Sequence, residues 1–320
     1  AASQTSVAAS QTSVAASQTS VAASQTSDNA SQVTDFRQYL QRTLLQDTVV
    51  HEQTIPPCPE RLAHSTSHLG PDVERVLAAS GITSLWSHQE EGIRLLREGQ
   101  DIVVATPTAS GKTLVYNTAV LADLLQNPAG CAIYIFPLKA LEQDQLEELR
   151  TVLGNLSCGL TAEIYDGDTK PHIREKIRKQ LPNILITTPD MLHAGILAFH
   201  EAWEELLRNL RWIVVDELHT YNGIFGSHVL HLFRRLNRLC SSYQSSPRYV
   251  SCSATIGNPT QLAERLFGRP FTAVTDSGAP TAPRHFLFVD PVESPNTVAA
   301  RLLQAGVLRQ LRTIVFTRAR

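Results

Sequence analysis

One short string limits the folds open to this chain more than any other feature. An apolar run at residues 101–105 is typical of a buried strand, a loop follows, and a helical apolar pattern runs from Thr113 to Leu124. Strand, loop and helix in this order place backbone N–H groups and the positive end of a helix dipole around an anion. The string therefore predicts an α/β sheet with a phosphate-binding loop at one edge.

The loop predicts contacts with a bound nucleotide. Lys112 is expected to reach the β- and γ-phosphates, and the Thr113 hydroxyl to help hold Mg²⁺. The general pattern G-x-x-x-x-G-K-[ST] has glycine where this chain has Thr106. Taken alone, Gly-Lys-Thr would also fit an ordinary helix start with a surface lysine, but the preceding strand favours the nucleotide site. The predicted nucleotide contacts in the loop are Thr106, Pro107, Thr108, Ala109, Ser110, Gly111, Lys112 and Thr113.

A second string places two acids at a strand end. Residues 211–215 are another buried run, and Asp216 and Glu217 close it. Because ligands of open α/β sheets bind at the carboxyl ends of the strands, Asp216 is expected to face Mg²⁺ and Glu217 the attacking water. A strand end followed by solvated turn residues is the alternative, and Lys112 about 100 residues upstream favours the catalytic interpretation.

Three further strings follow apolar runs in the same manner. Residues 137–139 follow the run at 132–136, residues 188–190 follow the run at 184–187, and residues 253–255 follow the run at 249–252. Free N–H groups at such helix starts bind phosphate without reading base identity. Thr188-Pro189-Asp190 is equally a helix-start signal, and both interpretations can hold together. Ser253-Ala254-Thr255 by itself is more simply a turn.

The order of these strings resembles the first motor lobe of superfamily 2 helicases of the DExH type. In finer detail, residues 106–113 with residues 216–229 resemble the Hrq1/MrfA group, the RecQ4-related DNA repair helicases, in which the threonine at 106 is a group trait. The resemblance implies ATP and Mg²⁺ as cofactors and adenine recognition by Gln89. It implies contacts with the nucleic-acid backbone at Pro137, Leu138, Lys139, Thr169, Thr188, Pro189 and Asp190. It implies coupling between nucleotide state and strand movement at Ser253, Ala254 and Thr255.

The function that follows is the ATP-binding lobe of an ATP-dependent DNA helicase or translocase in DNA repair. Its partner would be single-stranded or partly duplex DNA. An RNA helicase lobe is one alternative, since only RNA offers a 2′-hydroxyl to read. A fragment that binds nucleotide or nucleic acid without hydrolysis is another, because the second lobe of the family supplies a catalytic arginine and this chain stops at the start of that lobe.

Composition adds exclusions. The formal net charge is −2, so binding to nucleic acid requires a local basic patch, and residues 170–179 are the candidate, with a solvated helix face as the equal alternative. The five cysteines form no C-x-x-C pair, and His228 with His231 lacks a fourth metal ligand. The sequence shows neither an apolar run of about 18 residues nor a signal peptide, so the prediction is a cytoplasmic protein without membrane contact, with the nucleoid or the nucleus as alternative compartments. The sequence does not identify a protein partner.

The predicted organisation has four parts. Residues 1–33 are a heptapeptide repeat expected to be disordered, because one valine per repeat buries too little surface. Residues 34–69 are a helix at 34–54 and a linker. Residues 70–270 form the RecA-like P-loop domain, a doubly wound parallel sheet flanked by helices. Residues 271–320 begin a second, truncated RecA-like domain, with strands at 283–289 and 312–316. The helices expected in the third and fourth parts lie at 88–98, 112–126, 138–153, 173–181, 191–199, 226–240, 260–267 and 296–311.

Overall fold

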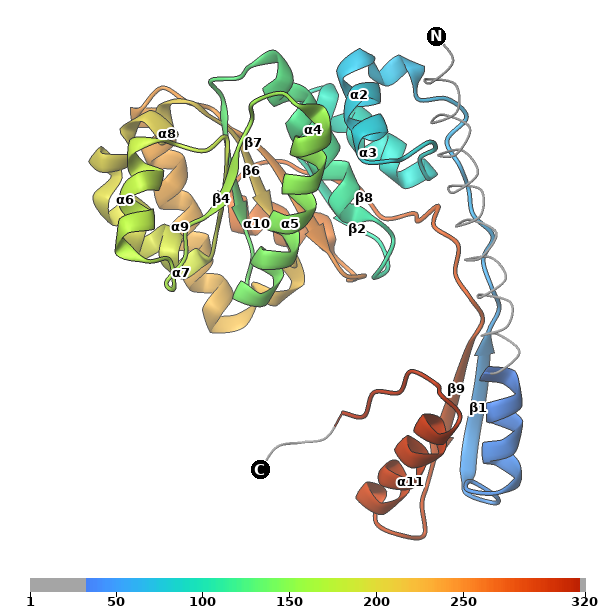
Figure 1. Ribbon diagram of the computed structural model, residues 1–320. Helices are drawn as coiled ribbons and strands as arrows, with labels where there is room; N and C mark the ends of the chain where they lie inside the picture. Colours follow the sequence, from blue (N-terminus) through green and yellow to red (C-terminus); the bar gives the residue numbers. More distant parts are fainter. Residues whose placement is uncertain (1–32, 317–320) are drawn as a thin grey trace, which may run out of the picture. The chain divides into compact units, whose positions relative to one another are not determined.

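The computed structural model describes residues 33–316 and divides them into two compact units. The large unit is residues 59–279, and the small unit is residues 33–58 together with residues 280–316. The predicted disorder of the heptapeptide repeat lies outside the described residues except at Val33, which is helical. Figure 1 shows the helices and strands of both units.

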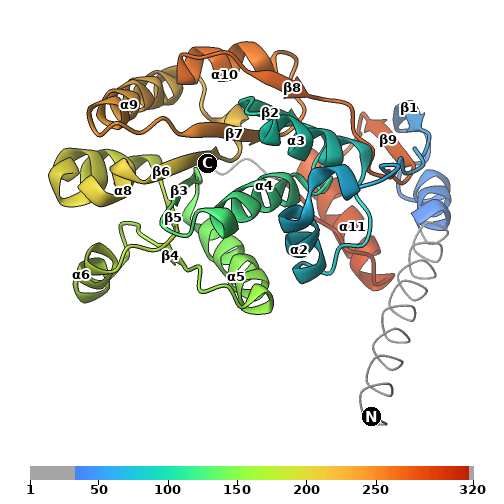
Figure 2. The same ribbon diagram turned by 90° about the horizontal axis from the view of Figure 1, so that it is seen from above.

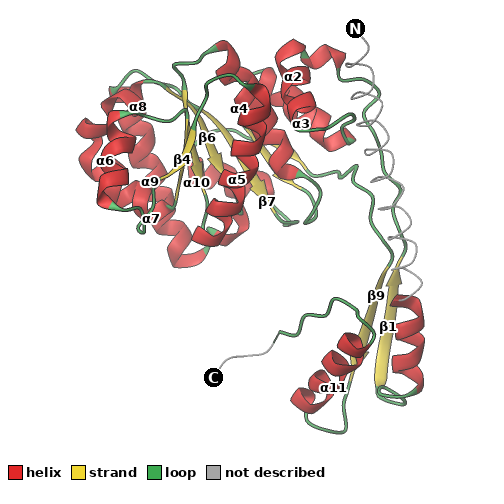
Figure 3. Cartoon of the chain, viewed as in Figure 1, coloured by secondary structure: helices red, strands yellow, loops and turns green. Residues whose placement is uncertain are grey.

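A seven-stranded sheet forms the centre of the large unit, in the order β4-β5-β3-β6-β7-β2-β8. Every pair of neighbouring strands is parallel, so the predicted doubly wound α/β fold is confirmed (Figure 3). The strands are β2 (Ile102–Ala105), β3 (Cys131–Ile135), β4 (Ala162–Ile164), β5 (Ile184–Thr187), β6 (Leu210–Val215), β7 (Arg248–Ser253) and β8 (Thr272–Val274).

Helices cover both faces of this sheet (Figure 2). The side chains of Ile102 and Val104 belong to the core on one face, and Val103 belongs to the core on the other. Burial on both sides explains why the strands read as continuous apolar runs. The first face carries α2 (Pro71–Ala79), α3 (Ser87–Arg97), α4 (Lys112–Gln126) and α5 (Lys139–Leu156). The second carries the π-helical turn η2 (Leu192–Ile196), η3 (Leu197–Trp203), α8 (Glu204–Arg208), α9 (Gly223–Ser242) and α10 (Pro259–Phe267).

Short elements join these layers at the strand ends. Helix α6 (Pro171–Lys179) connects β4 to β5 and buries only Ile177. The remaining short elements are η1 (Ser67–Leu69), α7 (Pro189–Met191) and η4 (Leu218–Thr220). The helix predicted at 191–199 is wrong in detail, because the chain there passes from α7 into a π turn and then a 3₁₀ segment with non-helical dihedral angles at Phe199. The elements that the sequence did not predict are α2, β4, α8 and β8.

The edges of the large unit differ from the predicted boundaries at 70 and 270. Strand β8 pairs with β2 at one edge of the seven-stranded sheet, so residues beyond 270 belong to the large unit. At the other end, Arg61 lies beside the start of α3, where its carbonyl accepts a hydrogen bond from the Ser87 N–H at 2.8 Å. Its own N–H donates to the Gly278 carbonyl at 2.8 Å. Residues 59–69, predicted as a linker, therefore belong to the large unit.

The small unit is built around a two-stranded antiparallel sheet of β1 (Val49–Ile55) and β9 (Arg284–Val289), with α11 (Pro295–Leu308) after it. The helix predicted at 34–54 is wrong beyond residue 42. Asp47 takes a left-handed φ of 61°, and the residues after it, rich in β-branched side chains, pair with β9. Strand β9 and the helix predicted at 296–311 are confirmed. Residues 312–316 form no strand and pair with no other described residue.

Candidate functional site

The phosphate-binding loop lies between β2 and α4, as predicted. Ala109 and Gly111 both take left-handed backbone conformations, with φ of 61° and 68°. A Cβ atom at Gly111 would lie 2.4 Å from Gln89 Nε2, so only glycine fits there. Lys112 Nζ donates to the carbonyls of Thr106 and Pro107 at 3.0 and 2.9 Å. The lysine thus lies over its own loop, where an incoming phosphate would replace these two carbonyls.

Thr106 explains how the loop closes without the glycine of the general pattern. Its φ is not positive, so the position does not require glycine. Its buried hydroxyl lies 2.6 Å from the Ser110 hydroxyl and ties the two ends of the loop together. Thr106, in place of the glycine of the general pattern, therefore adds a hydrogen bond within the loop.

Gln89 and His88, at the start of α3, support the loop from behind. Gln89 Nε2 donates to the Gly111 carbonyl at 3.2 Å, and its Oε1 accepts the Trp86 N–H at 3.0 Å. The contact of Gln89 with adenine stays a prediction. His88 is fully buried, and this burial lowers its pKa, so it is neutral. Its Nε2–H donates to the Ser110 carbonyl at 2.8 Å, and its Nδ1 accepts the Gly278 N–H at 3.1 Å. The sequence did not predict this role.

Strand β6 delivers Asp216 and Glu217 to the same edge of the sheet. Asp216 Oδ1 accepts the Glu217 N–H at 2.7 Å, and Oδ2 accepts the Tyr116 hydroxyl at 3.3 Å. Removal from water raises the pKa of the Asp216 carboxyl, and the adjacent Glu217 charge acts in the same direction. A divalent cation would lower that pKa again, and carboxylate with hydroxyl oxygen is the donor set that Mg²⁺ prefers.

His219 connects the acidic strand end to the string at 253–255. Its Nδ1 lies 3.3 Å from Glu217 Oε2 and 3.4 Å from the Ala254 nitrogen. With a hydrogen on Nδ1 the imidazole would donate to the carboxylate, whereas without one Nδ1 would accept the Ala254 N–H. Ser253 is buried, and within the described range its hydroxyl oxygen has no hydrogen-bond partner. A link between the two strings exists, and its use in coupling stays a prediction.

A cleft of about 940 Å³ opens over these residues. The loop residues 108–113 line one part of it, α2 and α5 line another, and Gln89, Asp216 and Glu217 complete the wall. Its volume lies within the range of about 300–1,000 Å³ that ligand sites occupy. The structure thus brings the predicted loop, acids and glutamine into one cleft, and this cleft fits a nucleoside triphosphate with its cation.

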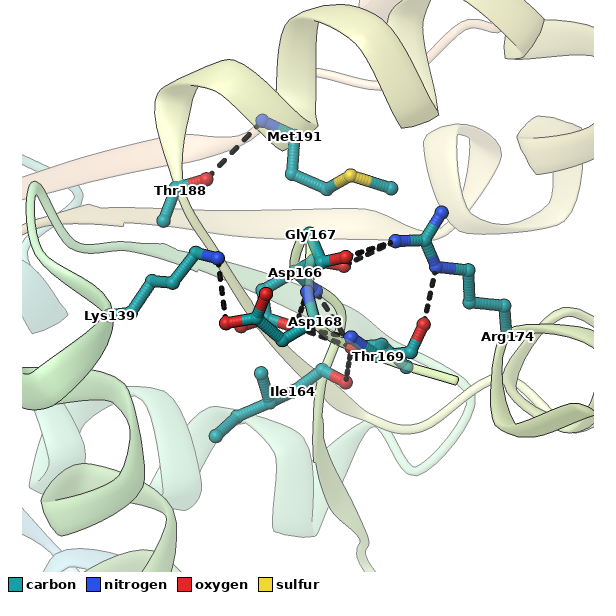
Figure 4. Close-up of polar contacts among 9 residues, drawn as sticks. All are labelled: Lys139, Ile164, Asp166, Gly167, Asp168, Thr169, Arg174, Thr188 and Met191. Atoms are coloured by element: carbon teal, nitrogen blue, oxygen red, sulfur yellow. Dashed lines mark hydrogen bonds and ion pairs between the residues drawn. The ribbon is translucent and has the colours of Figure 1, made fainter. Parts of the chain in front are cut away.

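The predicted nucleic-acid contacts lie on three neighbouring segments (Figure 4). Lys139 begins α5, and its Nζ lies 2.8 Å from Asp168 Oδ2. Thr169 ends a tight turn in which Asp166 Oδ1 accepts the Thr169 N–H at 2.8 Å and its hydroxyl at 2.7 Å. Thr188 Oγ1 accepts the Met191 N–H at 3.3 Å, so the helix-start interpretation is confirmed.

Burial separates the members of this predicted set. Leu138 and Asp190 are exposed, whereas Thr188 and Pro189 are buried. Pro189 therefore has little surface to offer a ligand, and Pro137 is half-buried.

Arg174 is a residue that sequence analysis placed only within a basic stretch. Its guanidinium donates to the carbonyls of Thr169 and Asp166, both at 2.8 Å, and of Gly167 at 2.9 Å. It thereby fixes the turn that presents Thr169. The rest of the basic stretch is exposed on α6, where Lys179 pairs with Glu175 at 2.7 Å. Within residues 33–316, no group of three or more His, Cys, Asp or Glu side chains is arranged to hold a metal, and no helix is long and apolar enough to cross a membrane.

A parallel sheet with a phosphate loop and an acidic strand end at one edge defines a RecA-like nucleotide-binding lobe. The chain belongs to the DEAD/DEAH box helicase family, whose model matches residues 86–262. It is 41% identical over 283 residues to the uncharacterized ATP-dependent helicase YprA of Bacillus subtilis, which covers 86% of this chain and 38% of YprA. It is 35% identical over 282 residues to the ATP-dependent helicase HRQ1 of Saccharomyces cerevisiae, covering 84% of this chain and 26% of HRQ1.

Solved structures agree with these relatives. The crystal structure of the DUF1998 helicase MrfA bound to DNA and AMPPNP matches with a TM-score of 0.83 and 39% identity, over 90% of this chain and 41% of that one. The predicted resemblance to the Hrq1/MrfA group is therefore confirmed. The family consists of ATP-dependent helicases, which confirms a nucleotide cofactor at the level of the family. This chain spans less than half the length of each of these relatives.

Proposed function

We propose that this chain is the ATP-binding lobe of an ATP-dependent DNA helicase or translocase that serves DNA repair. The observation that carries the proposal is the convergence of Lys112, Asp216 and Glu217 on one cleft backed by Gln89. Relatives named as ATP-dependent helicases, and a similar structure determined with DNA, favour DNA over RNA as the polymer. Its compartment is then one that holds DNA, either the bacterial cytoplasm or the nucleus.

Each residue of the cleft has a role in this proposal. Lys112 leaves the loop carbonyls and binds the β- and γ-phosphates, while the N–H groups of the loop surround them. Thr113 and Asp216 hold Mg²⁺, which neutralises triphosphate charge when bound. Glu217 orients the attacking water, and the Glu217–His219–Ala254 contact passes the nucleotide state to residues 253–255.

The second surface of the lobe is the interface of Lys139, Thr169 and Thr188. The Lys139 ammonium, the Thr169 hydroxyl and the N–H groups of the helix starts hold phosphates of a single strand, whereas the buried Thr188 contributes by capping its helix start. Binding of this kind tolerates any sequence and weakens with salt. In this family a second lobe supplies an arginine for hydrolysis, so residues 33–316 are proposed to bind ATP and to hydrolyse it efficiently only together with that lobe.

The experiment uses the full chain with a fluorescent ATP analogue, with a labelled single-stranded DNA and with an RNA of the same sequence. Wild type is expected to bind the analogue, and Lys112→Ala to lose this binding by at least about tenfold, because the phosphates lose their only loop cation. Equal affinity in both proteins would overturn the site. Tighter binding of RNA than of DNA would overturn the choice of polymer, and Lys112-dependent turnover would show that the chain needs no second lobe.

A further inference from the structure

A groove of about 350 Å³ lies beside the candidate nucleic-acid interface, between α6 and the segment from α7 to η3. Its volume falls within the range of about 300–1,000 Å³ that ligand sites occupy. No residue of the nucleotide cleft lines it. The residues that line it are Tyr165, Pro171, Arg174, Arg178, Met191, Ala194, Gly195 and Phe199.

The floor of the groove is apolar and depends on a glycine. A Cβ atom at Gly195 would lie 2.2 Å from Met191 Cε and 3.3 Å from the ring of Tyr165, so glycine lets the thioether lie across this turn. Gly195 belongs to the π-helical turn η2, a rare conformation that is frequent at functional sites. Its carbonyl accepts the indole N–H of Trp203 at 3.1 Å. This hydrogen bond to a buried tryptophan stabilises the irregular turn.

Phe199 forms an exposed aromatic wall. It is 64% exposed, in a backbone conformation (φ −122°, ψ 41°) that interrupts the helical segment. A single exposed apolar side chain is common on protein surfaces, but this ring also lines the groove beside the candidate phosphate contacts. Exposed rings beside a phosphate-binding surface are the stacking platforms of proteins that bind single strands.

The opposite wall is cationic. Arg174 is committed to the turn at 166–169, and its charge also lies over the ring of Tyr165, 5.6 Å from the centroid. Arg178 is exposed, and within residues 33–316 its guanidinium makes no side-chain hydrogen bond or ion pair. A guanidinium with no partner opposite an exposed ring suits a planar, electron-rich group attached to an anionic chain.

The groove opens between two candidate phosphate contacts. Arg174 bonds the carbonyl of Thr169, and the N–H of Met191 bonds the hydroxyl of Thr188 (Figure 4). We propose that this groove takes one unpaired nucleobase of a single strand whose phosphates lie on Thr169 and Thr188, with Phe199 stacking on the base and Arg178 facing it. The inference rests on the proposed function and adds a base contact to an interface otherwise made with the backbone.

The test compares two labelled oligomers of equal length, an oligothymidylate and one made only of abasic sites, by fluorescence anisotropy with the full chain at fixed salt. Phe199→Ala is expected to weaken oligothymidylate binding about 5- to 150-fold and abasic binding less than about twofold, since stacking contributes about 1–3 kcal/mol per base. Phe199→Trp is expected to restore the wild-type affinity, which separates stacking from misfolding.

Two matched controls complete the design. Ile224→Ala removes another exposed apolar side chain (81% exposed), which does not line the groove. It is expected to change the affinity for neither oligomer. Lys179→Gln, which removes a charge from α6 outside the groove, is the control for Arg178→Gln. Arg178→Gln is expected to weaken oligothymidylate binding more than Lys179→Gln does, and to weaken abasic binding to the same extent. Equal losses for both oligomers in Phe199→Ala, or no loss, would overturn the groove while leaving the proposed function intact. Failure of wild type to bind either oligomer would overturn both.

Discussion

Glu142 offers the sharpest test of the electrostatics beneath the candidate interface. It lies in the first turn of α5, is 1% exposed, and its Oε1 has no hydrogen-bond partner within the described chain. Burial raises the pKa of the Glu142 carboxyl from 4.5 to about 7, the Asp166 charge adds to this rise, and Lys139 opposes it. The buried carboxyl is thus held in its neutral form at mildly acidic pH.

The sign of the effect follows from proton linkage. A carboxyl whose pKa is higher in the folded protein holds its proton more tightly there. Its contribution to stability is therefore present below pH 4.5 and is lost as the pH rises through about 7. At about 1.4 kcal/mol for each pKa unit, this rise corresponds to at most about 3.5 kcal/mol. Local relaxation reduces the figure, and we expect Glu142→Gln to be more stable than wild type by about 1–3 kcal/mol at about pH 8.5.

Urea unfolding followed by tryptophan fluorescence measures this difference, because Trp86, Trp203 and Trp212 all lie in the large unit. At about pH 4.5 the two proteins are expected to unfold at nearly the same urea concentration. Glu147→Gln, at an exposed position of the same helix, is the matched control and should show no such pH dependence. A stability difference between Glu142→Gln and wild type that stays constant from about pH 4.5 to about pH 8.5 would refute the reasoning.

Two further predictions concern residues near the carboxyl end and near the amino end of strand β6. Glu217→Gln should bind the ATP analogue as wild type does and lower any DNA-stimulated hydrolysis by at least about 100-fold, because an amide cannot take the proton of water. Phosphate release measures the rate of hydrolysis. An unchanged rate would exclude Glu217 as the general base. Asp123→Ala should lower the free energy of unfolding by about 2–3 kcal/mol, since it leaves unpaired the guanidinium of Arg211, bonded at 2.7 Å, and the indole N–H of Trp212, bonded at 2.8 Å. Urea unfolding reports this loss, and a loss under about 0.5 kcal/mol, or weaker ATP-analogue binding, would contradict a purely structural role.

The parts of the fold and site that sequence could predict are those carried by contiguous strings. Strand, loop and helix at 101–124 and the acidic end of β6 each contain their own signals, and burial of the sheet on both faces makes its strands easy to recognise. The contributions of Lys112, Asp216 and Glu217 follow from those strings alone.

Other features depend on partners far away in the chain. Strand β1 forms against β9, more than two hundred residues later, and local helical spacing could not reveal this pairing. His88 acquires its role from Ser110 and Gly278, which lie 22 and 190 residues away. From the sequence alone, Glu142 is expected to be a solvated acid on a helix, because its proximity to the turn at 166–169 is not visible there. No sequence pattern in residues 191–199 predicts a π turn. Tertiary contacts, rather than local preference, decide these positions.

The position of β2 in the sheet has a consequence for biosynthesis. Its two neighbours are β7 and β8, and Ile102 is paired with Val250 on one side and Thr272 on the other. On a ribosome that adds about 5–20 residues per second, the strand that carries the phosphate loop would wait roughly 10–30 s for both partners. The unpaired N–H and C=O groups along both edges of β2 remain open to wrong pairing during that interval. The nucleotide pocket is then among the last parts of the lobe to form, although its loop is among the first to be made.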